Sequence, residues 1–230
     1  MRNKRGLFLI TTGLLLIAAA LCLVAWNVME DKQAEEASSS ALSQLTELIP
    51  KPTKPEGTDP PVVTIPDETT PDGTTQPPET QPELWTEPEI PDYILNPNMP
   101  MPEKKVDGWK YIGIIEIPSC ELQLPVITKW SNRALKVAPC RYAGSAYTDD
   151  LIICAHNYST LFRPVMTLNE GSEIRFTDMD GNVFVYIVVE RESLLPTDVE
   201  EMKAGQWDLT LFTCTFGGEY RITLRCERVE

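Results

Sequence analysis

The sequence has few of the residues that metal centres and nucleic-acid interfaces need. It contains one histidine, His156, and no Cys-x-x-Cys pair, so a tetrahedral zinc site is poorly supported. Its formal net charge is −14, and its basic cluster, Arg2, Lys4 and Arg5, is confined to the N-terminus. A nucleic-acid partner would require a basic face. We therefore predict no metal, no other cofactor and no nucleic-acid partner.

Charged residues are absent from 6–26, which form an apolar run. A helix of this length spans a hydrocarbon core of about 30 Å. Basic residues precede the run, whereas Glu30 and Asp31 follow it, which predicts a cytoplasmic N-terminus and an extracellular remainder. We thus expect a single-pass protein of the cell membrane, with 1–5 as a cytoplasmic basic tip and 6–26 as the transmembrane anchor.

Two other readings of the N-terminus stay open. A cleaved signal peptide usually has an apolar region of about 7–15 residues that ends in a small-x-small site. Here the run is longer, and the alanines at 18–20 lie inside it. A lipoprotein signal would place a small residue before Cys22, where the sequence has Leu21. An uncleaved anchor is the interpretation that the composition favours.

Residues 27–105 are acidic and rich in proline, threonine and glutamate. Up to about residue 49 the composition allows a polar helix, but 15 of the 20 prolines lie between Pro50 and Pro102. Proline removes a backbone donor and keeps the preceding residue out of the helical region, so this part is expected to be extended. We predict that 27–105 is an extracellular stalk that carries a folded domain, residues 106–230.

The folded domain is predicted to be mainly β. Short runs of β-branched and aromatic residues alternate with turn-forming residues, which indicates seven or eight strands in a barrel or sandwich. The runs are 111–117, 122–127, 151–155, 173–177, 183–189, 209–214 and 220–226. Two short segments, 159–169 and 198–204, have a helical composition.

Three residues at strand ends form a plausible set for acyl transfer. His156 follows one predicted strand, Cys214 ends another, and Arg221 lies in the next. A thiolate can attack a carbonyl, an imidazole can move protons, and a cation can stabilise developing negative charge. A lone histidine is more often structural, so the hypothesis of acyl transfer rests on the combination of the three residues.

Five cysteines follow the apolar run, which is an odd number. At least one thiol of Cys120, Cys140, Cys154, Cys214 and Cys226 must therefore stay free or pair with another chain, and up to two disulfides are allowed. Cys154 is the main alternative to Cys214 as a reactive thiol, because it lies two residues before the histidine and on the same face of a continuing strand.

The motif TLFTC at 210–214, with Arg221 after it and His156 58 residues before Cys214, resembles the sortase family of cysteine transpeptidases. The segment YIGIIEIPSCELQLPVI at 111–127 is similar to the opening strand pair of that family. The resemblance covers about 107–229. It implies a closed, roughly eight-stranded β-barrel with short helices, so that 106–230 would be the catalytic domain.

The resemblance also implies roles for individual residues. Cys214 matches the nucleophile, His156 the general acid and base, and Arg221 the arginine that positions substrate and stabilises the oxyanion. Thr213 matches the threonine that helps to bind the sorting motif. Arg225 competes with Arg221, but it lies later than the family spacing suggests.

The implied reaction is cleavage of a surface protein's C-terminal sorting signal, of the type Leu-Pro-x-Thr-Gly, followed by transfer to a cell-wall precursor or pilin amine. The short segment between Cys214 and Arg221 and the context Ala-His-Asn resemble class B or class D members. An extracellular cysteine peptidase and a non-catalytic β-barrel binding module are the alternatives. A papain-like peptidase would place its cysteine before its histidine, whereas the order here is reversed.

Overall fold

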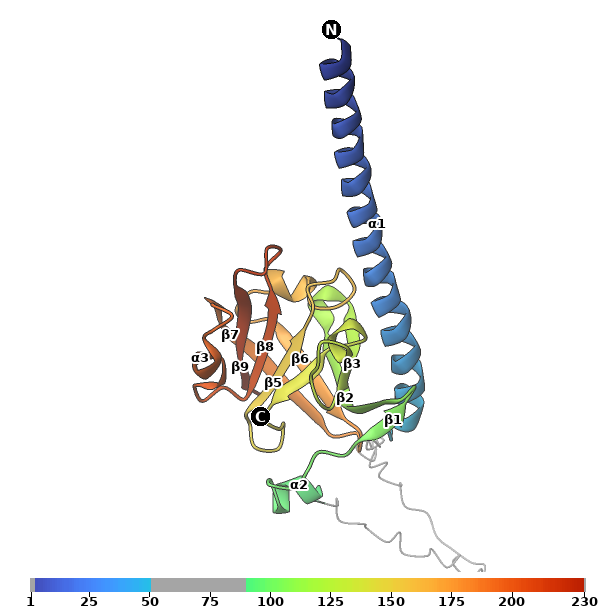
Figure 1. Ribbon diagram of the computed structural model, residues 1–230. Coiled ribbons are helices and arrows are strands. Elements are labelled where there is room, and N and C mark those ends of the chain that lie inside the picture. The colour runs from blue at the N-terminus through green and yellow to red at the C-terminus, as the bar shows by residue number, and fades with distance from the viewer. Residues whose placement is uncertain (1–2, 51–89, 230) are drawn as a thin grey trace, which may run out of the picture.

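The computed structural model describes residues 3–50 and 90–229. Most of the proline-rich part of the predicted stalk, residues 51–89, lies outside the described residues. The described part consists of a long N-terminal helix and a β-barrel that lies beside the C-terminal half of this helix (Figure 1).

The barrel is built from short strands joined by turns and single helical turns. The helices are α1 (Asn3–Leu48), α2 (Asp92–Leu95) and α3 (Val199–Lys203), and the 3₁₀ turns are η1 (Pro118–Cys120), η2 (Ala134–Lys136) and η3 (Pro164–Thr167). The strands are β1 (Lys104–Val106), β2 (Trp109–Ile117), β3 (Leu122–Ile127), β4 (Cys140–Ala143), β5 (Leu151–Ala155), β6 (Glu173–Asp178), β7 (Val183–Leu194), β8 (Leu209–Cys214) and β9 (Arg221–Arg228).

Eight of the described strands close into a ring in the order β2, β3, β4, β5, β8, β9, β7 and β6, and β6 pairs again with β2. Closure is tight at Gly113, where a Cβ atom would lie 2.4 Å from the Thr177 carbonyl oxygen. β1 is not part of the ring and pairs with the first residues of β2. The prediction of a closed, roughly eight-stranded barrel is confirmed.

Apolar side chains from all sides of the ring fill its interior. Ile115, Phe176, Phe184, Leu211 and Leu224 are fully or almost fully buried in this core. Burial of each such side chain contributes about 1.5–3 kcal/mol, which holds the strand ends in fixed positions. β5 and β8 run parallel, from Leu151 paired with Leu209 to Ala155 paired with Thr213. Their carboxyl ends therefore meet at one rim of the barrel.

The structure differs from the sequence prediction at three places in the domain. The helix expected at 159–169 is instead a series of turns that ends in η3, whereas the helix expected at 198–204 is confirmed by α3. β4 was not predicted, and the sheet begins at Lys104, two residues before the boundary that we placed at Val106.

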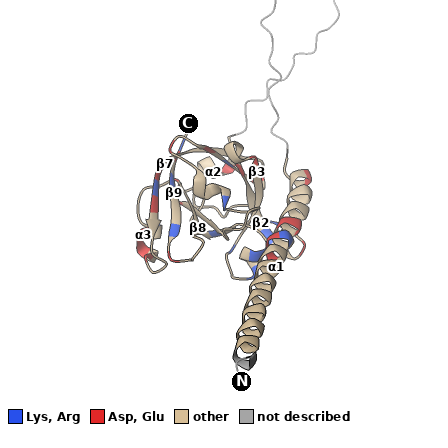
Figure 2. Ribbon diagram, turned by 90° about the horizontal axis from the view of Figure 1, so that it is seen from above, with Lys and Arg blue, Asp and Glu red and all other residues tan. Residues whose placement is uncertain are grey.

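Helix α1 combines the predicted apolar run with the polar helix expected after it. The side chains of 6–26 are almost all exposed, and α1 is long and apolar enough to cross a membrane. Beyond them, Ala34, Ala41 and Leu45 are buried against the barrel. Figure 2 shows α1 lying along the outside of the ring, near β2. Residues 27–48, which we assigned to the stalk, are thus packed on the domain.

Candidate active site

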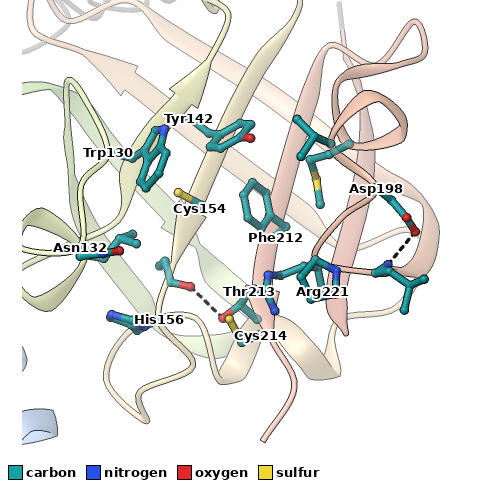
Figure 3. Close-up of a pocket in the computed structure, with 16 residues that line it drawn as sticks. Trp130, Asn132, Tyr142, Cys154, His156, Asp198, Phe212, Thr213, Cys214 and Arg221 are labelled. Atoms are coloured by element: carbon teal, nitrogen blue, oxygen red, sulfur yellow. Dashed lines mark hydrogen bonds between the residues drawn. The ribbon is translucent and has the colours of Figure 1, made fainter. Parts of the chain in front are cut away.

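A pocket of about 320 Å³ lies at the rim where β5 and β8 end (Figure 3). One end of it is polar and includes His156, Cys214 and Arg221. The remaining wall is largely apolar, and its side chains include Trp130, Leu135, Tyr142, Leu195, Val199, Met202 and Phe212. The structure thus brings the three predicted catalytic residues to one end of an apolar pocket, from three different segments.

Cys214 is the last residue of β8, and its side chain is half-buried. It lies directly opposite Arg221 in the antiparallel pairing of β8 with β9. Directly opposite residues of antiparallel strands have Cβ atoms about 4.5–5.5 Å apart, so a thiol and a cation share this part of the rim. In the view of Figure 3, Cys214 lies between the ring of His156 and the Arg221 side chain.

The Arg221 guanidinium is held by the turn between β8 and β9. Its Nη1 donates hydrogen bonds to the carbonyl oxygens of Gly218, at 3.1 Å, and Tyr220, at 3.3 Å. These two bonds use one of the guanidinium nitrogens. The planar guanidinium carries five N–H donors, so donors remain for an anionic oxygen in the pocket.

Arg225, the alternative to Arg221, lies in a different environment. It is buried, with 3% of its side chain exposed, and its Nε donates to Glu192 at 2.6 Å. Its other nitrogens donate to the carbonyl oxygens of Glu201 and Met202 and to the hydroxyl of Thr210. This guanidinium is occupied by structural contacts and lies away from the end of β8.

His156 follows β5 directly and is half-buried. Its ring stacks on Tyr158, with ring centroids 5.0 Å apart and the planes inclined by 28°. Burial lowers the pKa of His156 below its ordinary value, and the Lys136 cation lowers it further, whereas Glu30 raises it. The neutral imidazole is therefore favoured near neutral pH, and a neutral imidazole can accept a proton.

Thr213, the predicted substrate-binding residue, lines the pocket, but its hydroxyl is engaged within the barrel. Oγ1 donates a 2.9 Å hydrogen bond to the carbonyl oxygen of Ala155, which links β8 to β5 (Figure 3). The side chain is buried. In this structure the Thr213 hydroxyl thus joins the carboxyl ends of β5 and β8.

All six cysteines lie in the described part of the chain, and each is a free thiol. Cys154, the alternative nucleophile, is buried, and burial raises its pKa. Burial also raises the pKa of Cys140 to about 12 and raises that of Cys226. The thiolate is the reactive form of cysteine, so burial and the raised pKa disfavour reaction at these three thiols. Cys154 does line the pocket, but it is buried, whereas Cys214 is half-buried.

The sequence analysis did not predict the residue that connects the two strand ends or the aromatic residues of the pocket wall. The Asn157 side chain donates a 3.2 Å hydrogen bond to the carbonyl oxygen of Thr215, which connects the segment after the histidine to the segment after the cysteine. The aromatic wall of Trp130, Tyr142 and Phe212 was also missed, because its members come from three separate segments. Among the residues described, no cluster of His, Cys, Asp and Glu could hold a metal ion.

The chain is similar to solved structures of sortases. Sortase A from Corynebacterium diphtheriae is 24% identical, with a TM-score of 0.49, over 53% of this chain and 62% of that one. Sortase C from Streptococcus pneumoniae is 24% identical, with a TM-score of 0.49, over 55% and 71%. The Sortase D5 transpeptidase of Clostridium perfringens is 21% identical, with a TM-score of 0.47, over 52% and 79%.

This chain thus spans less than two thirds of the length of the Corynebacterium protein. No curated protein matches the chain. The family model of the sortase domain matches residues 115–229, which contain all of the predicted catalytic residues. Since this match covers half of the 230 residues, the chain belongs to the sortase family.

Proposed function

We propose that this protein is a membrane-anchored cysteine transpeptidase that cleaves a C-terminal sorting signal and transfers the acyl group to an amine. The observation that carries the proposal is the position of Cys214 at the end of β8, opposite Arg221 and at the same end of the pocket as His156. The apolar wall suits an extended peptide with apolar side chains, such as a Leu-Pro-x-Thr-Gly signal.

In the first step the Cys214 sulfur attacks the scissile carbonyl, and His156 takes the thiol proton. The carbonyl oxygen becomes an anion, which the Arg221 guanidinium stabilises with its remaining N–H donors. The carbon–nitrogen bond then breaks, and the leaving amine takes the proton from His156. The product is a thioester between the signal peptide's carbonyl carbon and Cys214.

In the second step an acceptor amine attacks the thioester. His156 removes a proton from this amine, the carbon–sulfur bond breaks, and the sulfur leaves as a thiolate that takes up the proton again. The energy of the original peptide bond is kept in the thioester, so no nucleotide cofactor is needed. A cell-wall precursor or a pilin lysine would supply the amine.

The helix α1 supports the proposed location. Its residues 6–26 are apolar and exposed, basic residues precede them in the sequence, and acidic residues follow. These features favour a single pass through the cell membrane with the N-terminus in the cytoplasm and the barrel outside. Surface proteins that carry a sorting signal would reach the pocket from the same membrane.

The test uses the full chain in detergent with quenched peptides that carry Leu-Pro-x-Thr-Gly variants and with an added amine. We expect cleavage, a product joined to the amine, and a covalent adduct at Cys214 detected by mass spectrometry. Cys214→Ala should abolish all three, whereas Cys154→Ala should keep them. Lack of cleavage and of labelling of Cys214 by a thiol-reactive probe would refute the proposal. Cleavage that never transfers to the amine would favour a peptidase.

A further inference from the structure

The first polar turn of α1 lies against the segment that carries His156. Glu30 and Asp31 follow the apolar run by four and five residues, and they contact residues that lie 128 and 129 positions later in the chain. At 1.5 Å per residue, Glu30 is about 6 Å along the helix axis from Trp26. The end of the membrane-spanning run and the candidate active site are therefore neighbours.

Glu30 connects α1 to two groups beside His156. One carboxylate oxygen accepts a hydrogen bond from the Lys136 ammonium at 2.7 Å, and the other accepts one from the Tyr158 hydroxyl at 3.3 Å. The hydrogen bond from Lys136 lowers the pKa of Glu30, so the carboxylate is charged near neutral pH. Tyr158 is the residue whose ring stacks on the imidazole.

Asp31 fixes the next two residues of the same segment. Its carboxylate accepts hydrogen bonds from the backbone amide of Ser159, at 3.3 Å, from the Ser159 hydroxyl, and from the Thr160 hydroxyl, at 3.1 Å. Burial alone would raise the pKa of Asp31, but the hydrogen bonds from Ser159 and Thr160 lower it below its ordinary value. Asp31 is therefore a charged acceptor for several donors of one loop.

A buried face further along α1 fixes the position of the helix on the barrel. Ala34, Ser38, Ala41 and Leu45 are spaced by four, three and four residues, and all are buried against the barrel. Glu30 lies four residues before Ala34 and continues this face by one turn. Because the helix is continuous, the buried face determines where Glu30 and Asp31 lie relative to the loop after β5.

We propose that the turn of α1 that contains Glu30 and Asp31 is a positioning element of the active site, which holds Tyr158 and residues 159–160 so that the imidazole of His156 is fixed in place. Among the described residues, no hydrogen bond to the imidazole is present, so stacking on Tyr158 is the contact that orients it. The proposal rests on the proposed function insofar as His156 is the catalytic acid and base.

The same contacts predict how the charge on His156 depends on its neighbours. Lys136 and Glu30 are the charged groups that lower and raise the pKa of His156. Tyr158 stays protonated because burial, and then Glu30, raises its pKa to about 12. Cys214 and Arg221 face the same end of the pocket and are the same in every variant considered below.

The experiment exploits the single histidine. The full chain is prepared in detergent with isotope-labelled histidine and without a histidine tag, so that the imidazole resonances report His156 alone. Glu30→Gln removes the charge that raises its pKa, and the titration midpoint should fall by roughly half a pH unit or more. Lys136→Gln should move the midpoint in the opposite direction. The acid limb of kcat/KM should move with the same sign in each variant.

The matched control is Glu36→Gln, which removes one exposed acid from the same helix and should leave the midpoint unchanged. Asp31→Ala should speed amide exchange in 156–160, measured by hydrogen exchange, whereas Glu36→Ala should not. Equal midpoints in Glu30→Gln, Lys136→Gln and the unsubstituted chain, or unchanged exchange in Asp31→Ala, would overturn the proposal. The titration needs no turnover, so failure of the transpeptidase hypothesis would be recognised separately.

Discussion

Arg221 and Arg225 lie four residues apart on β9, yet their surroundings differ. Arg221 is half-buried beside Cys214, and among the described residues its guanidinium donates only to the carbonyl oxygens of Gly218 and Tyr220. Arg225 is buried and ion-paired with Glu192. Removal of the buried Arg225 guanidinium leaves several partners without hydrogen bonds. Removal of the Arg221 guanidinium at the pocket leaves the barrel folded.

We therefore expect Arg221→Ala to lower kcat by about 10²–10³-fold with little change in stability, since it removes the proposed donor to the oxyanion. Arg225→Ala should lower the free energy of unfolding by about 3 kcal/mol, because Glu192 is left unpaired at the barrel wall. Steady-state kinetics with a sorting peptide and urea unfolding of each full-length variant measure the two effects. An active, stable Arg221→Ala variant would remove this residue from the mechanism.

Some residues of the candidate site could be predicted from the sequence, and others could not. Cys214, His156 and Arg221 were predicted because the motif TLFTC, with its flanking histidine and arginine, resembles a known family. Nothing local in the sequence marks Glu30, because its relation to Tyr158 arises only when α1 packs on the barrel. Thr213 is the opposite case. The motif marks it as a substrate-binding residue, but its hydroxyl donates a hydrogen bond to the carbonyl oxygen of Ala155.

Strands that are rich in β-branched and aromatic residues were predictable, and short or irregular elements were not. β2, β3, β5, β6, β8 and β9 coincide closely with the predicted runs because their apolar residues face the core. β4 has four residues, too few to show a period. The helix expected at 159–169 is interrupted because the amide of Phe162 bonds to the His156 carbonyl and Arg163 Nε bonds to the Asn157 carbonyl.

Helix α1 docks through small residues, which lets its backbone approach the barrel closely. Ala34 and Ala41 are buried in this face, and between them lies Ser38, which is 3% exposed. Its hydroxyl has no hydrogen-bond partner among the described residues. A buried hydroxyl without a partner costs about 1–3 kcal/mol, so this position weakens the interface that holds α1 in place.

Ser38→Ala is thus expected to raise the free energy of unfolding by about 1 kcal/mol, because it removes the unpaired hydroxyl and leaves the methylene carbon as a methyl group. Urea unfolding of the full chain in detergent measures this. Ser39→Ala is the matched control, since Ser39 is exposed on the same helix and reports the helix propensity alone. A gain no larger than that of the control would mean that the Ser38 hydroxyl is satisfied.

On the scale of the whole molecule, α1 sets the direction in which the pocket faces. The helix extends past the barrel on the side of the turn between β8 and β9 (Figure 1). Contacts support this arrangement, since Asp31 bonds to Ser159 at the pocket end of the barrel, whereas Gln44 bonds to Asp107, next to β1. If residues 6–26 span a membrane, the pocket rim faces that membrane and the opposite end of β9 points away from it.

This orientation can be measured by energy transfer from a dye on the barrel to acceptor-labelled lipid headgroups in nanodiscs. Cys214 lies opposite Arg221 at one end of β9, and the exposed Glu227 lies six residues further along, about 20 Å away. With Cys22 and Cys120 replaced by alanine, transfer from a dye on Cys214 should exceed transfer from a dye on Glu227→Cys in a Cys214→Ala background. Equal or reversed efficiencies would show that the barrel is tilted away from the axis of α1, so that the pocket does not face the lipid surface.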